Sequence, residues 1–412
     1  MALDMVNIKS TLSGSGITFK KMLRGSDNKE VWSAGAIVTY VLDTFNGAVT
    51  SYTEDVDNGA SCLAPTTFDP QDFADSTWSG NGWVFVGWRE DTRASSNVLS
   101  SKIMGTEPIT LYAVFKQTIT VGYTDNNGRN TTSDTRYYNN GNFVNPSFTL
   151  YQQGASGWTS RGWSTSNQGD ASITYLNGAT FERNKSVELY ALYQKNVRLT
   201  TVVNGTSSYV DKTMYWAPAG EVIPTFAVSN PTISGATFKG WSVTAGNATV
   251  SYSSLASGIK LSSNLTVYAV VTYSNVTLKS GSTSYSRDSG TDLNVITGID
   301  GSKYSSLSIG VGDAWVETGR WATVCSARAI LRVKTSNGTT YTDTILHEMC
   351  WEEGYWSGEP YEAGTPIRNT TVTMNLYPDN VGQMLAVIFD GDAVGGNVYV
   401  NTVTAIGKTV VG

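Results

Sequence analysis

The sequence has few charged residues, three cysteines, one histidine and no long apolar run, and each shortage excludes a class of protein. Charged residues make up 15% of the 412, against roughly 25% in an average soluble protein. Three cysteines cannot build a disulfide framework. No apolar run is long enough to span a bilayer, and no basic-then-apolar leader follows Met1. We therefore expect no membrane insertion, no standard export signal and synthesis in a cytoplasm.

Residues for catalysis are also scarce. The one histidine, His347, lies in "LHEMCWEEG", and a zinc-protease helix would need a second histidine at position 351, where Trp351 stands. Any Ser-His-Asp triad would depend on the same His347. The chain has no phosphate loop or dinucleotide fingerprint, and its net charge of −6 gives no basic face for nucleic acid. We predict a protein that is not an enzyme and has no cofactor, no metal and no nucleic-acid partner. "FDGDAVGGN" (389–397) fits a cation site or a Gly-rich turn equally well.

What the chain has in quantity is glycine, small polar residues and aromatics. It contains 41 Gly, 22 Tyr and 12 Trp. This mixture favours pleated strands joined by tight turns and disfavours long helices. A chain of this length should also hold several domains, because single cores rarely grow beyond about 250 residues. We predict a mainly β, multidomain protein.

One strand is written three times, as "ITLYAVF" (109–115), "VELYALY" (187–193) and "LTVYAVV" (265–271). A Gly-Trp pair comes before each of these strands, and another strand-like run comes before each Gly-Trp pair. The whole unit therefore repeats about every 78 residues. A period this long predicts that each copy is a small domain. We expect the repeated aromatics to pack in the domain cores, with the glycine leaving room for the indole. These predicted core residues are Trp88, Tyr112, Trp163, Tyr190, Trp241 and Tyr268.

The repeat resembles the Listeria–Bacteroides repeat, the B-repeat of internalin-type surface proteins, in its "F-x-GW" middle and "LYA-x-[FW]" close. The nearest match is Phe85-Val86-Gly87-Trp88 with Leu111-Tyr112-Ala113-Val114-Phe115. The third copy reads Val267-Tyr268-Ala269 at the close, and the second lacks the Phe before Gly162-Trp163. The resemblance implies compact β-grasp-like modules that act as spacers or interaction domains without enzymatic activity.

The expected absence of a leader and of a wall-sorting tail distinguishes between two kinds of protein with such repeats, bacterial surface proteins and bacteriophage structural proteins. Bacterial surface proteins with such repeats carry both signals, whereas the chain begins MALDMVNIKS and ends GKTVVG. Similar repeats also resemble parts of bacteriophage structural proteins, where they follow a segment like "GSDNKEVWSAGAIVTYVLD" (25–43). Virions assemble in the cytoplasm and need no leader. The leading hypothesis is a bacteriophage virion component, and the rival is a cellular adhesin with B-repeat spacers.

Two regions lie outside the repeats. "ITFKKMLRGSDNKEVWSAG" reads as a hairpin with local positive charge from Lys20, Lys21, Arg24 and Lys29, which is either a docking patch or a solvated face. Beyond residue 276, short strand-like runs separated by turns predict an antiparallel β-sandwich or jelly roll. The predicted domains are residues 1–35 (docking hairpin), 36–117 (module 1), 118–195 (module 2), 196–275 (module 3) and 276–412 (C-terminal domain).

A candidate ligand site stands in "CWEEGYWSGEPYEAG" (350–364), where aromatic and acidic residues alternate between glycines. Aromatic faces stack on sugar rings and carboxylates accept hydrogen bonds from hydroxyls, so an exposed loop of this kind would suit a glycan. Two glutamates could also serve a glycosidase as acid and base. Alternatively the aromatics fold inward and the glutamates only solvate the rim. The candidate glycan-binding residues are Trp351, Glu352, Glu353, Tyr355, Trp356, Glu359 and Tyr361.

"VKTSNGTTYTD" predicts a two-residue hairpin turn at Asn337-Gly338. Pairing around that turn places Arg332 opposite Asp343, Ile330 opposite Ile345 and Cys325 opposite Cys350. The two cysteines would then be cross-strand neighbours and reduced, unless a bulge shifts the register. Cys62 is predicted to be unpaired.

The sequence as a whole favours a bacteriophage structural protein of the tail, fibre or head decoration, docked by its N-terminal hairpin and extended by three modules. Its C-terminal domain would attach to a host surface or glycan after assembly in the bacterial cytoplasm. The expected partners are other virion proteins and further copies of the chain, with a trimer the best estimate, because edge strands invite pairing. A bacterial adhesin is the alternative and a glycoside hydrolase a distant third.

Overall fold

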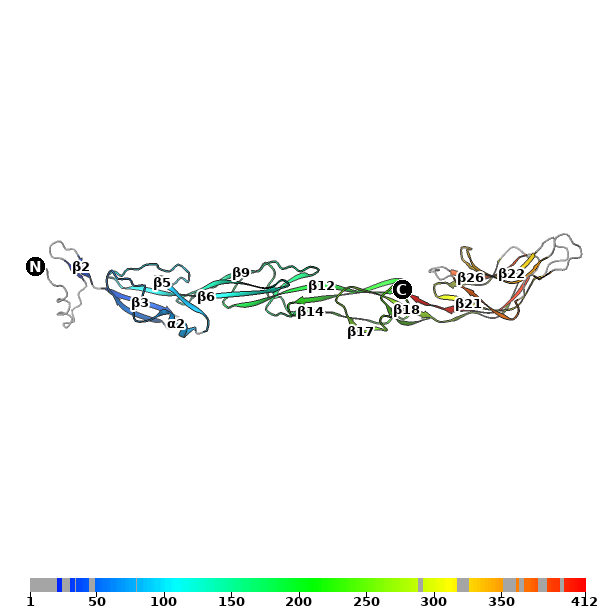
Figure 1. Ribbon diagram of the computed structural model, residues 1–412, viewed down its shortest axis with the longest axis horizontal. Coiled ribbons are helices and arrows are strands. Elements are labelled where there is room, and N and C mark those ends of the chain that lie inside the picture. The colour runs from blue at the N-terminus through cyan, green and yellow to red at the C-terminus, as the bar shows by residue number, and fades with distance from the viewer. Residues whose placement is uncertain are drawn as a thin grey trace. The chain divides into compact units, whose positions relative to one another are not determined.

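The computed structural model describes residues 21–23, 30–33, 35–43, 49–78, 80–287, 292–316, 326–350, 361–362, 367–376, 384–392 and 396–412. The chain divides into two compact units, one within Met1–Lys195 and Met214–Val222, the other of Asn196–Thr213 and Ile223–Gly412. Regular structure in the described ranges is almost entirely β, with one short helix. The predicted mainly β class is therefore confirmed (Figure 1).

The N-terminal hairpin predicted from the sequence is present. Strand β1 (Lys21–Leu23) runs antiparallel to β2 (Glu30–Ser33), with Lys21 opposite Ser33. Lys20, Arg24 and Lys29 lie outside the described residues, and the docking role of residues 1–35 remains a prediction.

Module 1 has a mixed sheet in the order β4-β3-β6-β5. Its first strand runs parallel to its last, with Val38 opposite Ile109, while β5 is antiparallel to β6. A short helix follows the first hairpin, capped by the Asp69 side chain, which accepts a hydrogen bond from the Gln71 amide at 2.8 Å. This arrangement is β-grasp-like. The elements are β3 (Ala36–Asp43), β4 (Thr50–Val56), α2 (Pro70–Thr77), β5 (Trp83–Arg89) and β6 (Ile109–Asp125).

Module 2 repeats the plan with a two-stranded β9–β11 sheet in place of the helix. Its opening strand, the second half of β6, runs parallel to its closing strand, and Val121 lies opposite Val187. The elements are β7 (Gly128–Asn139), β8 (Asn142–Val144), β9 (Ser147–Thr149), β10 (Thr159–Ser164), β11 (Thr180–Glu182) and β12 (Val187–Val203).

Module 3 has the same pairings, with Leu199 opposite Leu265, and a β15–β17 pair in the helix position. The elements are β13 (Thr206–Ala217), β14 (Gly220–Val222), β15 (Thr225–Val228), β16 (Ala236–Ser242), β17 (Leu255–Lys260) and β18 (Leu265–Tyr273).

The predicted module boundaries at 117 and 195 fall inside strands β6 and β12. Buried residues of unit 1 nevertheless form two clusters, one around Trp88 and one around Trp163. The first cluster includes Tyr138 from β7, a strand of module 2. Likewise Trp216, which lies in module 3 by sequence, packs against the module 2 cluster. Module 1 and module 2 thus have separate cores that the following hairpin strand completes, and the domain boundaries themselves remain predictions.

The C-terminal domain folds as a nested series of antiparallel strand pairs: β19 with β27, β20 with β26, β21 with β25 and β22 with β23. Further pairs, β21 with β27 and β22 with β26, roll this ribbon into two sheets, β19-β27-β21-β25 and β20-β26-β22-β23-β24. This is the strand order of a jelly roll. The elements are β19 (Val276–Arg287), β20 (Leu293–Asp300), β21 (Tyr304–Val316), β22 (Ser326–Thr335), β23 (Thr340–Cys350), β24 (Tyr361–Glu362), β25 (Thr370–Asn375), β26 (Met384–Asp392) and β27 (Gly396–Gly407).

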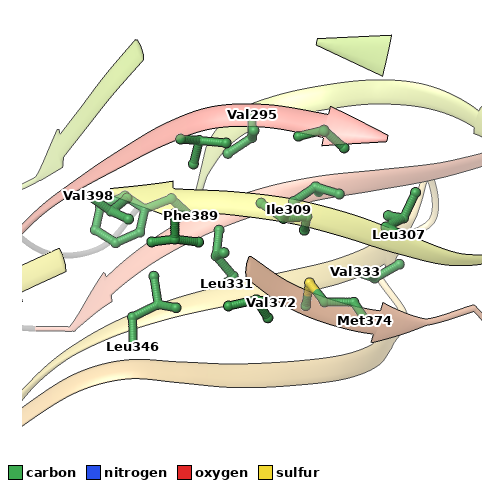
Figure 2. Packing of buried hydrophobic residues seen from close by; sticks show 14 of the residues in the cluster. Val295, Leu307, Ile309, Leu331, Val333, Leu346, Val372, Met374, Phe389 and Val398 are labelled. Carbon is green, nitrogen blue, oxygen red and sulfur yellow. The ribbon is translucent and has the colours of Figure 1, made fainter. Parts of the chain in front are cut away.

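The core of this domain lies between the two sheets. Figure 2 shows Leu307, Ile309 and Val398 from one sheet packed with Leu331 and Phe389 from the other. Alternate residues of β21 and β27 are buried, as expected when one face of each strand is covered.

The chain does not end in the jelly roll. Its last strand, β28 (Thr409–Val411), pairs antiparallel with β18 of module 3, with Val270 opposite Val411. In module 1 the residue that corresponds to Val270 is Val114, and it pairs with Asn139 of β7. The C-terminal strand therefore takes, at module 3, the place that the next hairpin takes at module 1. As a result the jelly roll is joined to module 3 twice, by the chain between β18 and β19 and by the pairing of β28 with β18.

The β22–β23 hairpin follows the predicted register only in its middle. Arg332 lies opposite Asp343 and Ile330 opposite Ile345, as predicted. The turn is longer than predicted, because the Thr335 amide bonds the Thr339 carbonyl at 2.8 Å across the three residues Ser336–Gly338, with Gly338 at φ +91°. Beyond Ile330 the register shifts by one residue, so Cys350 pairs with Ser326. The predicted pairing of Cys350 with Cys325 is therefore wrong. The physical reason is a β-bulge between Ala329 and Ile330, because one extra residue in a strand shifts every later cross-strand pair. Cys325 lies outside the described residues.

Candidate binding surfaces

The repeated tryptophans are core residues of the modules. Trp88, Trp163 and Trp241 are each at most 1% exposed. Each follows a β-bulge in the strand that carries it. They lie in the cores as the sequence reasoning expected, where they stabilise the modules and offer no face to a ligand.

The glycines before Trp163 and Trp241 lie against the backbone of a neighbouring loop. Gly162 and Gly240 have φ of +133° and +146°, which disfavours any side chain. A Cβ on Gly162 would meet the Tyr175 carbonyl oxygen at 2.6 Å, and one on Gly240 would meet the Tyr252 carbonyl oxygen at 2.7 Å. Thus Gly162 and Gly240 leave room for a neighbouring loop backbone and form the bulge, and the expected space for the indole remains a prediction.

The repeated tyrosines lie on the other face of the sheet. Tyr112, Tyr190 and Tyr268 are half-buried, whereas their strand neighbours Leu111 and Ala113 are fully buried. Side chains alternate along a strand, so burying the Leu and Ala positions turns the tyrosine outward. The three tyrosines were expected to be buried in the module cores, and this expectation was wrong.

The predicted glycan loop lies almost wholly outside the described residues. Trp351, Glu352, Glu353, Tyr355, Trp356 and Glu359 are among the residues not described. Its two ends are placed: Cys350 of β23 is the backbone partner of Tyr361 of β24. Strands β23 and β24, on either side of these residues in the chain, are therefore neighbours in the five-stranded sheet. Whether it binds a ligand remains a prediction.

A surface that the sequence reasoning missed lies on the outer face of sheet β19-β27-β21-β25. Trp315 and Tyr399 point outward there, 36% and 38% exposed, between buried neighbours. Asn397 is the cross-strand partner of Trp315 and accepts a hydrogen bond from Ser284 Oγ at 2.9 Å. Its amide donates to the Tyr399 hydroxyl at 3.4 Å. The signal was present in "AWV" (314–316) and "VYV" (398–400), where one aromatic stands between two apolar residues.

The reactive side chains of the described residues are held in structural contacts. His347 is buried, and its Nδ1 accepts a hydrogen bond from the Val316 amide at 3.0 Å. Cys62 is a free, buried thiol, as predicted, and burial raises its pKa. Asp390, in the segment weighed as a cation site, is ion-paired with Arg332. Among the described residues there is no cluster of three or more acidic, His or Cys side chains able to hold a metal.

Two stretches of the chain match the family model of the Listeria–Bacteroides repeat domain, residues 37–114 and 200–270. They fall in modules 1 and 3, so the chain carries at least these two copies of the repeat. No curated protein matches the chain. A solved structure titled "The 2.6A structure of Infectious Bursal Virus Derived T=1 Particles" is 12% identical, with 73% of this chain and 76% of that chain covered and a TM-score of 0.15. A TM-score this low is no sign of a shared fold.

The part of the chain that the structure describes holds no helix with the length and apolar character needed to cross a membrane.

Proposed function

We propose that this protein is a structural component of a bacteriophage virion, in the tail, a fibre or a head decoration. In this role its repeat modules act as spacers and its jelly roll attaches to a host surface or glycan. The observation that carries the proposal is the way the modules join. Strand β6 passes from module 1 into module 2 without a linker, and β7 supplies Tyr138 to the core of module 1. Such a joint favours a spacer of fixed length over a flexible tether.

The jelly roll is a reasonable attachment domain on two grounds. Double-sheet jelly rolls are common in viral and lectin domains, although fold alone does not fix function. The pairing of β28 with β18 ties the domain to module 3 through a second connection, which suits a domain that must resist pulling. Trp315 and Tyr399 offer exposed aromatic surface beside the Asn397 amide on the outer face of sheet β19-β27-β21-β25.

Antibodies against residues 276–412 test the location. Electron microscopy of purified phage particles should show label on the particles, and the genes beside this one should encode portal, capsid or tail proteins. Label on the wall of uninfected cells would instead support the rival, a cellular adhesin. We also propose that the protein is not an enzyme, and release of sugars from host polysaccharides by purified protein would favour the third candidate, a glycoside hydrolase.

Two sets of aromatic residues test attachment. Replacing Trp315 and Tyr399 by Ala should weaken binding to host cells if the outer sheet makes the contact, and replacing Trp351 and Trp356 should do so if the loop makes it. Far-ultraviolet circular dichroism distinguishes loss of binding from loss of folding. The proposed trimer is tested by analytical ultracentrifugation, where a monomer at high concentration would contradict it unless the particle supplies the symmetry.

A further inference from the structure

Module 2 contains a groove that modules 1 and 3 fill with side chains. It has a volume of about 400 Å³, which lies within the range of ligand sites. The groove lies between strand β7 and strand β9. Its lining residues are Tyr123, Asn130, Thr132, Ser133, Asp134, Ser147, Phe148, Thr149 and Tyr151.

The same space is closed in the sister modules. In module 1, Tyr52 stacks on Phe68 with ring centroids 4.4 Å apart, and Glu54 accepts hydrogen bonds from the amides of Thr66 and Thr67 at 2.8 and 2.7 Å. The residue facing Tyr123 at the Tyr52 position of module 2 is the smaller Asn130.

In module 3, a lysine spans the gap. Lys212 stands one repeat after Asp134 and donates a hydrogen bond to the Thr225 carbonyl at 2.6 Å, with its ammonium 5.7 Å from the Phe226 ring centroid. Replacing this lysine by the shorter aspartate leaves the groove of module 2 open.

One wall of the groove is a fixed aromatic ring. Tyr151 is 38% exposed, and its hydroxyl donates a hydrogen bond to the buried Asp125 carboxylate at 2.9 Å. The ring also meets Trp163 edge-on with centroids 5.0 Å apart. A ring held in this way presents one face to a ligand at little entropic cost. The residue one repeat later is Ser229, so module 3 lacks this wall as well.

The chemistry of the lining selects the ligand. Hydroxyl and amide groups can donate and accept hydrogen bonds, while the floor is formed by the buried rings of Tyr123 and Phe148. The lining contains one carboxylate and no lysine or arginine, which disfavours anions. From these features we infer that module 2 binds a neutral oligosaccharide, with a sugar ring stacked on Tyr151 and its hydroxyls bonded to the β7 and β9 side chains. This site is separate from the C-terminal domain and independent of the proposed attachment function.

The experiment uses the purified full-length chain on an array of neutral bacterial and plant oligosaccharides, with the strongest binder then titrated by calorimetry. Tyr151→Ala removes the wall, and Asp134→Lys copies the closure of module 3 at an exposed position. We expect each variant to bind at least tenfold more weakly. Lys212→Asp, in module 3, is the matched control and should leave the module 2 site unchanged. Circular dichroism confirms folding, and Asp134→Lys keeps the test valid if Tyr151→Ala destabilises the module.

Three results would overturn the inference. The first is a wild-type chain that binds no neutral oligosaccharide on the array, and the second is variants that bind as tightly as the wild type. The third is capture of extended peptides that survives Tyr151→Ala, since the outer edge of β7 from Gly128 to Arg136 could instead accept an added strand.

Discussion

Tyr138 of module 2 donates its phenolic hydrogen to the buried carboxylate of Asp43 in module 1. The same hydroxyl accepts a hydrogen bond from the Gly141 amide at 2.9 Å. Because Tyr138 is fully buried in the module 1 cluster, one module provides both packing and a polar contact to the core of the other. Their stabilities should therefore be coupled.

Tyr138→Phe should destabilise module 1. The substitution keeps the ring but removes both hydrogen bonds, and a hydrogen bond to a charged group such as the Asp43 carboxylate contributes about 1.5–3 kcal/mol. Hydrogen exchange of the β3 amides in the full-length protein measures this opening free energy. Tyr137→Phe, at the half-buried neighbour, is the control and should have little effect. Equal effects of the two variants would contradict the coupling.

Gly162→Ala should destabilise module 2 by about 1–3 kcal/mol, because the alanine would be forced into a disfavoured conformation. Its Cβ would also meet the Tyr175 carbonyl oxygen. Gly154→Ala in the same module is the matched control, since its Cβ would meet nothing within 4 Å. Thermal unfolding should show a lower midpoint for the first variant only. A midpoint equal to that of the wild type would show that the bulge tolerates a side chain.

Stability should fall in alkaline solution. Burial, assisted by nearby Glu54 and Cys62, raises the pKa of Tyr40 to about 12, and burial together with Asp125 raises the pKa of Tyr193 to about 12. An unfolded tyrosine has a pKa near ~10. Because the folded pKa is the higher one, the stabilisation is complete below pH ~10 and is lost as the pH rises from ~10 towards the folded value.

Urea unfolding at a series of pH values between 8 and 11 (about one unit apart) measures this loss. Tyr193→Phe removes one ionisable hydroxyl and should make the loss shallower. Tyr209→Phe, at a tyrosine that is 62% exposed, should leave it unchanged. A stability that stays flat up to pH ~11 would count against the tyrosines as its source.

Deleting residues 409–412 should expose an edge of module 3. The deletion removes β28, so the β18 amides between Val270 and Thr272 should exchange faster with solvent. The bare edge should also promote association at high concentration. Thr272→Val is the control, because it removes only the exposed 3.0 Å contact between the hydroxyls of Thr272 and Thr409. Unchanged exchange after the deletion would show that β28 does not protect this edge.

Much of the fold could be predicted from the sequence because it depends on local patterns. The Gly-Trp pairs and the repeated "LYA"-type strands identified the modules, and the strand-like runs after residue 276 predicted a sandwich. Arg332 opposite Asp343 followed from counting around a turn. Counting failed at Cys350 because a single bulge moves every later pair by one residue, and no local signal marks where a bulge will fall.

The candidate sites were harder to predict, since exposure depends on what packs against a strand. Tyr112, Tyr190 and Tyr268 were expected in the cores and lie half-buried on the opposite face. Trp315 and Tyr399 were overlooked, because aromatic residues in strands are usually buried. The open groove beside Tyr151 is visible only when the three modules are compared in space.

The sequence alone determined the β class, the three-fold repeat and the positions of the buried tryptophans, because composition and periodicity act over a few residues at a time. Only the tertiary structure decided that β7 completes the core of module 1 and that β28 returns to pair with β18. It also decided that Lys212 closes in module 3 the groove that Asp134 leaves open in module 2. These relationships join residues that are far apart in the chain. The free energy that favours them comes from burying apolar surface and from hydrogen-bonding the backbone groups of neighbouring strands. A local sequence pattern does not reveal which distant strands will become neighbours.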